Sequence, residues 1–217
     1  IKQLDLIKKT KFYQASTSEM FGKVHEVPQS ETTPFHPRSP YGVSKVAAHW
    51  IVRNYRESYN LFACCGILFN HESPRRGNDF VTQKIVKGIA NVLNGTQSYL
   101  ELGNLESKRD WGHAKDYIQA MWLMLQQPQP DDYIVSSGCQ HSIKEFIESV
   151  LKVYNLEIIW KGLGLCQEGS ILGGKIIVKV SEKFYRPCEV DSLIGDHTKI
   201  KSIGWEPLYS FDELVED

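Results

Sequence analysis

Short apolar runs alternate with longer amphipathic stretches along the chain, and this alternation predicts the secondary structure. Residues 11–15 and 61–69 are mainly apolar, as are strands buried on both faces of a parallel sheet. Between these runs, residues 40–59 have the pattern of a long helix with an apolar side that suits packing on a sheet. The apolar side chains that define this predicted packing face are Val43, Val46, Ala47, Trp50, Ile51 and Tyr55.

The same pattern continues to the end of the chain. Further helices are predicted at residues 80–93, 116–125, 142–154 and from 210 onward, and further strands at 99–102, 133–135, 158–160 and 176–178. Residues 1–9 are expected to be the last turns of a helix. Loops are expected at 21–38, 70–78 and 108–113, with a loose glycine-containing loop at 162–174. Met121, Trp122 and Leu125 are expected to lie in the core. Strands that alternate with helices indicate an α/β fold with a doubly wound, Rossmann-like parallel sheet.

Composition narrows the classes of function. The 217 residues carry 25 Lys and Arg and 26 Asp and Glu, and a net charge of −1 argues against a nucleic-acid surface or a polybasic membrane patch. No apolar run approaches the ~20 residues that span a bilayer. The five cysteines form no Cys-x-x-Cys pair, so no metal site or disulfide framework is indicated, and we expect a reducing cytoplasm.

Two polar segments carry the candidate chemistry. Thr17 and Glu19 follow the first predicted strand, at the carboxyl edge where α/β sheets bind ligands. Tyr41 and Lys45 share one face of the next helix, and an ammonium close to a phenol favours the phenolate, which can act as a general base. Taken alone, these pairs also fit a polar strand-end turn and a surface helix pair, since about one Tyr-x-x-x-Lys arises by chance in this composition.

Longer strings surround these residues. They are residues 12–19 (FYQASTSE), 37–42 (PRSPYG), 66–77 (GILFNHESPRRG), 102–105 (LGNL), 108–117 (KRDWGHAKDY) and 185–187 (YRP). In this order they resemble the GDP-mannose 4,6-dehydratases, a family of the extended short-chain dehydrogenase/reductase superfamily. The resemblance runs from Lys11 almost to the end of the chain.

The resemblance implies a hydro-lyase that converts GDP-mannose to GDP-4-keto-6-deoxymannose with NADP, the first step toward GDP-fucose. The sugar 4-hydroxyl is oxidised, water is lost across C5 and C6, and hydride returns to C6. The implied catalytic roles are a base at O4 for Tyr41 with Lys45 beside it, a hydrogen bond to O4 for Thr17, and transfer of the C5 proton to O6 for Glu19. A simple epimerase needs no acid at the position of Glu19, so this residue favours dehydration.

The resemblance also implies binding residues. Those expected to reach the cofactor are Tyr41, Lys45, His71 and Arg76. Those expected to bind the nucleotide sugar are Asn70, Lys84, Arg109, Arg186 and Glu189. Without the resemblance, His71 would be interpreted as a core or loop histidine, and each charged residue could equally form a surface ion pair.

The implied domain organisation places the carboxyl part of an NADP-binding Rossmann-like domain at residues 1–70. Residues 71–217 are expected to be mainly a smaller substrate-binding region, with some segments returning to the first domain. No Gly-x-Gly-x-x-Gly or Gly-x-x-Gly-x-x-Gly occurs, so we expect that the family's glycine-rich opening third precedes these residues. NADP cannot be distinguished from NAD on these residues.

Two alternatives remain open from the sequence. One is a related nucleotide-sugar dehydratase or epimerase, and the other is a truncated, non-catalytic homologue that acts as a binding subunit. Family members form dimers or tetramers, so a homo-oligomer is also expected.

Overall fold

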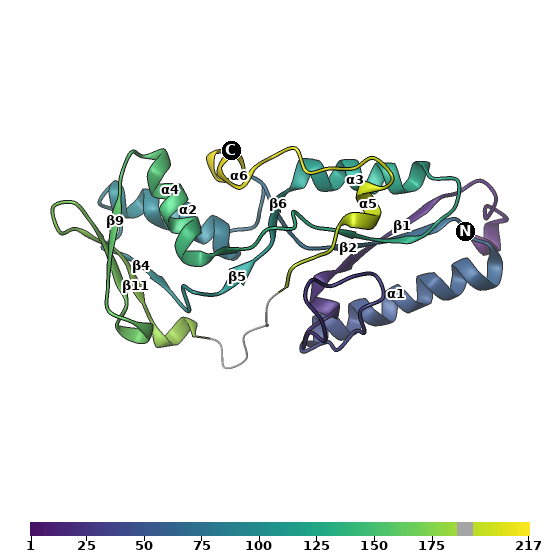
Figure 1. Ribbon diagram of the computed structural model, residues 1–217, viewed down its shortest axis with the longest axis horizontal. Coiled ribbons are helices and arrows are strands. Elements are labelled where there is room, and N and C mark those ends of the chain that lie inside the picture. Colours follow the sequence, from purple (N-terminus) through teal and green to yellow (C-terminus); the bar gives the residue numbers. More distant parts are fainter. Residues whose placement is uncertain (186–192) are drawn as a thin grey trace. The chain divides into compact units, whose positions relative to one another are not determined.

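The computed structural model describes residues 1–185 and 193–217 (Figure 1). Its contacts divide the chain into two compact units. The first comprises Ile1–His71, Arg109–Gln140 and Val190–Ser210, and the second comprises Glu72–Lys108, His141–Glu189 and Phe211–Asp217. Each unit is therefore assembled from segments that are distant in sequence.

The first unit is built on a three-stranded parallel sheet in the order β1-β2-β7. Its strands are β1 (Phe12–Thr17), β2 (Ala63–Leu68) and β7 (Asp132–Val135). All six residues of the central strand β2 are buried, as expected for a strand covered on both faces. Figure 1 shows α1 (Pro40–Tyr59) on one face of the sheet, and α3 (Ala114–Gln126) and α5 (Thr198–Lys201) on the other. The predicted α/β class with a parallel sheet is confirmed.

Helix α1 has the bounds that the sequence predicts. The Ser39 hydroxyl caps it by accepting a hydrogen bond from the Gly42 amide at 3.0 Å, and Pro40 occupies the first turn, where it leaves no helical hydrogen bond unmade. Asn60 ends the helix in the left-handed conformation (φ 53°). Because the cap and the proline are local signals, the start of α1 could be read from the sequence.

The predicted packing face of α1 is largely wrong, and of its residues Val46 is the one that packs against a core cluster. Val43, Trp50, Ile51 and Tyr55 are exposed, whereas His49 is buried against the sheet. Two apolar clusters lie on this side. One has Val52, Leu61, Ala63 and Cys65 as its buried members, and the other includes Ile67 and Ile134 and packs against Val46 of α1. Polar side chains of α1 instead find partners on the strands, which lets a polar face turn inward.

The opposite face of the sheet has a core of its own. Its buried members are Cys64, Leu68, Tyr117, Ala120, Met124, Tyr133, Val135, Ile200 and Trp205. Met121 and Leu125 pack against this cluster. Trp122 is 62% exposed, so its predicted core position is wrong: it lies on the outer side of α3.

The second unit contains a four-stranded sheet in the order β4-β11-β10-β9. Its strands are β4 (Leu100–Leu102), β9 (Ile158–Lys161), β10 (Glu168–Ile171) and β11 (Ile176–Val180), of which only the pair β4 and β11 is parallel. The helices of this unit are α2 (Val81–Leu93), α4 (Ile143–Val153) and α6 (Phe211–Glu216). α4 begins with the predicted capping box of Ser142 and Glu145.

Short elements complete the description. They are the paired strands β3 (Asn70–Glu72) and β6 (Trp111–His113), the paired strands β5 (Lys108–Arg109) and β8 (His141–Ser142), and the 3-10 helices η1 (Lys2–Leu4), η2 (Ser18–Met20), η3 (Gly164–Cys166) and η4 (Glu182–Phe184). Among the described helices, none has the length and hydropathy that crossing a membrane requires.

Several element predictions are wrong. Residues 1–9 form η1 and turns rather than the end of an α-helix, and the predicted loops at 70–78 and 108–113 contain β3, β5 and β6. The predicted loose loop at 162–174 contains β10, which pairs with β9 and β11. These short strands form because non-local partners supply their hydrogen bonds, which local sequence does not report.

Candidate active site

The carboxyl end of β1 leads directly into η2, and this turn positions Thr17 and Glu19. Thr17 caps η2, and its hydroxyl oxygen accepts a hydrogen bond from the Glu19 amide at 3.3 Å. Ser16, Ser18 and Met20 are buried, while Thr17 and Glu19 are half-buried between them. The alternation anchors the turn through its buried residues and leaves the hydroxyl and the carboxyl partly accessible.

The first turn of α1 lies against η2. A Cβ atom added to Gly42 would come within 2.8 Å of the Glu19 carbonyl oxygen, so only glycine permits this approach. Tyr41, the neighbour of Gly42, is 53% exposed. The Glu19 backbone is therefore fixed next to the residue that carries the exposed phenol.

Lys45 connects α1 to β1. Its ammonium donates a hydrogen bond to the Ala15 carbonyl at 2.9 Å and lies 5.6 Å from the centroid of the Tyr41 ring. Ala15 precedes Thr17 by two residues. The four residues predicted to be catalytic thus come from two touching elements, β1–η2 and α1, and the structure brings them together at one edge of the sheet.

Asn70 and His71 follow β2, the strand next to β1, and parallel strands end at the same edge of a sheet. The His71 Nδ1–H group donates to the Phe69 carbonyl at 2.9 Å, and its ring stacks on Tyr117 with centroids 4.7 Å apart. These contacts leave the His71 ring in a fixed orientation on the first unit, with Asn70 half-buried beside it.

Arg76 and Lys84 belong to the second unit, and each has a partner there. The Arg76 guanidinium lies 3.1 Å from the buried Glu72 carboxylate and 3.5 Å from the centroid of the Phe80 ring. Lys84 lies 3.4 Å from the centroid of the Phe184 ring, and burial lowers its pKa. Both residues therefore belong to a different unit from the cluster around Tyr41.

A buried carboxylate that sequence reasoning missed adjoins Arg109. Asp110 accepts hydrogen bonds from the Ser137 amide at 2.8 Å, the Ser137 hydroxyl at 2.7 Å and the Gly138 amide at 3.0 Å. It thereby holds the loop that follows β7, and burial raises its pKa to about 6. Arg109 itself is half-buried, and Arg186 and Glu189 lie outside the described residues.

Comparison with known proteins decides the family. A family model described as GDP-mannose 4,6 dehydratase matches residues 1–217. The chain belongs to the GDP-mannose 4,6-dehydratase family. The GDP-mannose 4,6 dehydratase of Dictyostelium discoideum is 53% identical over 219 residues, which cover 100% of this chain and 62% of that protein. The chain thus spans less than two thirds of the length of that relative.

Two solved structures of other proteins have a fold similar to that of this GDP-mannose 4,6-dehydratase family member. The dTDP-glucose 4,6-dehydratase of Bacillus anthracis in complex with NAD has a TM-score of 0.77 and 23% identity, over 99% of this chain and 63% of that chain. RMD from Pseudomonas aeruginosa complexed with NADPH has a TM-score of 0.79 and 24% identity, over 94% of this chain and 64% of that chain. At these identities the likeness concerns the fold alone, and it agrees with the predicted Rossmann-like architecture.

Proposed function

We propose that this protein is a GDP-mannose 4,6-dehydratase that uses NADP and forms the 4-keto-6-deoxy sugar nucleotide that leads toward GDP-fucose. The observation that carries the proposal is the contact between η2 and the first turn of α1, in a member of this family. It brings Glu19, the acid that a dehydration needs, beside the Tyr41 and Lys45 pair.

Tyr41 serves as the base for the sugar 4-hydroxyl. Its exposed ring allows the phenol oxygen to reach a bound substrate, and the Lys45 ammonium lies 5.6 Å from the centroid of the ring. Lys45 is itself held by the Ala15 carbonyl, which fixes the ammonium relative to the end of β1. Thr17 lies at this end and hydrogen-bonds O4 of the sugar, so that the reacting oxygen faces the phenol.

Glu19 removes the C5 proton and delivers a proton to O6 as water leaves. One carboxyl group can do both because the two atoms are neighbours in the sugar and the group regains its starting protonation state. Its backbone is fixed on both sides, by the Thr17 hydroxyl that accepts from its amide and by the packing of its carbonyl on Gly42. An epimerase has no use for this acid, which favours a dehydratase over that alternative.

The cofactor fits the donor set at this edge of the sheet. When bound, a nicotinamide takes hydride from C4 and supplies it to C6. The phenol of Tyr41 and the ammonium of Lys45 are suited to the ribose hydroxyls and to the place beside the nicotinamide ring, with His71 as a further contact. Contact of Arg76 with the cofactor is proposed from the family resemblance alone. We propose NADP because a structural neighbour is complexed with NADPH, although another is complexed with NAD.

The sugar nucleotide carries a diphosphate, which cations and amide groups bind. We assign this role to Asn70, Lys84 and Arg109. The same role for Arg186, and contact with the guanosine for Glu189, are proposed from the family resemblance because both lie outside the described residues. The substrate itself is proposed from the name of the relatives.

We also propose a cytoplasmic homo-oligomer. The outer side of α1 exposes Val43, Trp50, Ile51 and Tyr55, an apolar stripe that a second copy of the chain can cover. The four described cysteines are free thiols, which a reducing compartment maintains.

The test is a mass spectrum of GDP-mannose after incubation with the purified protein and NADP. The expected product is lighter by one water, and E19Q, which keeps the shape of the side chain, should not form it. A product of unchanged mass whose NMR spectrum differs from that of GDP-mannose would identify an epimerase. Binding of GDP-mannose without turnover would identify a binding subunit, and either result would overturn the proposal.

A further inference from the structure

Polar side chains line the side of α1 that faces the sheet. Tyr41, Lys45, His49 and Arg53 are spaced by four residues, so they lie along one side of the helix. Lys45 and Arg53 are half-buried and His49 is only 1% exposed. A fully buried histidine on a helix that could have turned its apolar residues inward calls for partners that offset its burial.

His49 finds one partner on β1. Its Nδ1 atom lies 3.0 Å from the hydroxyl of Ser16, which is also buried. One turn earlier, Lys45 donates to the carbonyl of Ala15. Two successive turns of α1 are therefore tied to two successive residues of β1, immediately before Thr17.

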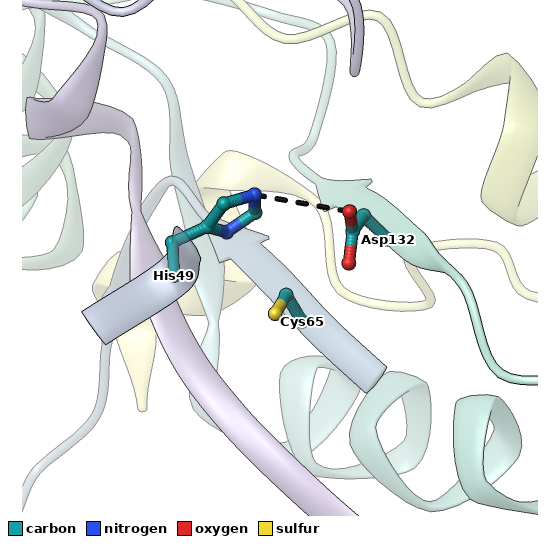
Figure 2. Close-up of side chains that lie close together, drawn as sticks. All are labelled: His49, Cys65 and Asp132. Carbon is teal, nitrogen blue, oxygen red and sulfur yellow. Dashed lines mark ion pairs between the residues drawn. The ribbon is translucent and has the colours of Figure 1, made fainter. Parts of the chain in front are cut away.

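The other side of the His49 ring faces Asp132, the first residue of β7, as Figure 2 shows. The Nε2 atom lies 3.7 Å from Oδ2 of Asp132. The same carboxylate accepts hydrogen bonds from Arg56 at 2.8 and 2.9 Å, and the Arg53 Nε atom lies 3.5 Å from it. Asp132 thus holds α1 through three side chains of the helix.

His49, Cys65 and Asp132 offer ligand atoms within 4.8 Å of one another, a spacing that could hold a metal ion. Charge argues against a cation there. Arg56 already uses both oxygens of Asp132, and a dication would face two guanidinium groups in a buried setting. Burial and Asp132 also raise the pKa of the Cys65 thiol, which keeps it protonated.

The same surroundings keep His49 neutral. Burial lowers its pKa, and Arg53 and Arg56 act in the same direction, against the opposing effect of Asp132. A neutral ring with its proton on Nε2 directs that proton toward Asp132 and accepts the Ser16 hydroxyl proton at Nδ1. Each ring nitrogen then faces one partner, Ser16 at Nδ1 and Asp132 at Nε2.

We propose that His49 is a positioning residue, which links Ser16 on β1 to Asp132 on β7 and so fixes the first turns of α1 against the end of β1. This inference rests on the proposed function, because it is the Tyr41 phenol and the Thr17–Glu19 turn that it aligns. His49 touches neither substrate nor cofactor in this scheme. A misplacement of about 1 Å between reacting groups can cost about 100-fold in rate, so the alignment has a measurable effect.

The test compares three substitutions of His49 in the purified protein. H49L removes the hydrogen bond to Ser16 and the contact with Asp132, and we expect kcat to fall about 10- to 100-fold with KM for GDP-mannose within about twofold. H49N keeps a polar atom near the position of Nδ1 and should recover most of kcat. H49Q places its amide nearer to the position of Nε2 and should not. A role in stability alone would not separate these two amides.

S16A and the exposed control N54A complete the set. S16A removes only the hydroxyl, so it should lower kcat like H49L, and the two effects should not add in the double variant. Amide hydrogen exchange over residues 12–20 should rise in H49L and S16A but not in N54A, and this reports on the link without any turnover. Equal activity of H49N and H49Q, or unchanged exchange in H49L, would overturn the proposal. If the wild-type protein does not convert GDP-mannose, the proposed function fails and exchange alone decides the role of His49.

Discussion

The backbone of Gly42 touches the carbonyl of Glu19, at a distance that leaves no room for a Cβ atom. This contact joins the helix that carries Tyr41 to the turn that carries Thr17 and Glu19. Because the obstructing atom belongs to the backbone, it cannot move aside as a flexible side chain would.

Replacement of Gly42 by alanine tests this contact. G42A should lower kcat at least about 10-fold and cost about 1–3 kcal/mol of stability, since the added methyl group forces α1 and η2 apart. Steady-state kinetics and thermal unfolding measure the two effects. G88A is the matched control: the three atoms nearest to a Cβ there all belong to the Leu100 side chain, so it should affect stability without changing kcat. Wild-type kinetics in G42A would show that the contact does not align the site.

The role of Glu19 predicts that its replacement affects dehydration but not binding of GDP-mannose. E19Q should lower formation of the dehydrated product by about 10²–10⁴-fold, because removal of a general acid and base costs this much, while GDP-mannose still binds. Mass spectrometry measures the product, and calorimetry measures binding. E26Q changes a carboxyl group on the nearby loop that has no proposed role in catalysis, and it should retain full activity. Loss of water at the wild-type rate in E19Q would assign the acid to another residue.

The pKa of Asp110 predicts a pH dependence of stability. Burial raises this pKa from 3.8 to about 6, so the folded state binds the proton more tightly than the unfolded state. Its contribution is therefore fully present below about pH 4 and is lost as the pH rises through 6, a change of up to about 3 kcal/mol. D110N has no such titration, so the free energy of unfolding of the wild type, minus that of D110N, should fall from pH 4 to pH 7. Urea unfolding at both pH values measures it, and a constant difference would contradict the shift.

The exposed stripe on α1 predicts the effect of a charge on assembly. I51K should convert an oligomer into monomers, because a buried, unpaired ammonium at an apolar interface is unfavourable. Light scattering after size-exclusion chromatography measures the mass. L172K, on an exposed leucine of the second unit, is the matched control and should leave the mass unchanged. A monomeric wild-type protein, or an I51K variant of unchanged mass, would exclude this stripe as the interface.

Helix α1 shows which features the sequence could predict. Its bounds follow from Ser39 and Pro40, which act locally, and they agree with the structure. Its orientation does not follow, because periodicity alone places the apolar side inward. The deciding partners, such as Asp132 for Arg56, lie 76 residues away and cannot be seen in a local pattern.

The candidate site was predicted to a similar extent. The choice of Thr17, Glu19, Tyr41 and Lys45 rested on the family resemblance together with local strand-end and helix-face signals, and the structure places them on the adjoining elements β1–η2 and α1. The pairing of Arg76 with Glu72 was not predicted, although the two are four residues apart, because the segment was interpreted as a loop. Asp110 was not predicted as a buried, hydrogen-bonded carboxylate because its hydrogen-bond donors are 27 and 28 residues away.

The three contacts that Asp132 makes with α1 have a consequence for how the sequence can evolve. Replacement of Asp132 alone would leave Arg56 without its carboxylate and His49 facing two guanidinium groups, so a single step away from this arrangement is costly. Positions 49, 53, 56 and 132 are therefore free to diverge only as a set. In related lineages, a change at one of them should be accompanied by changes at the others.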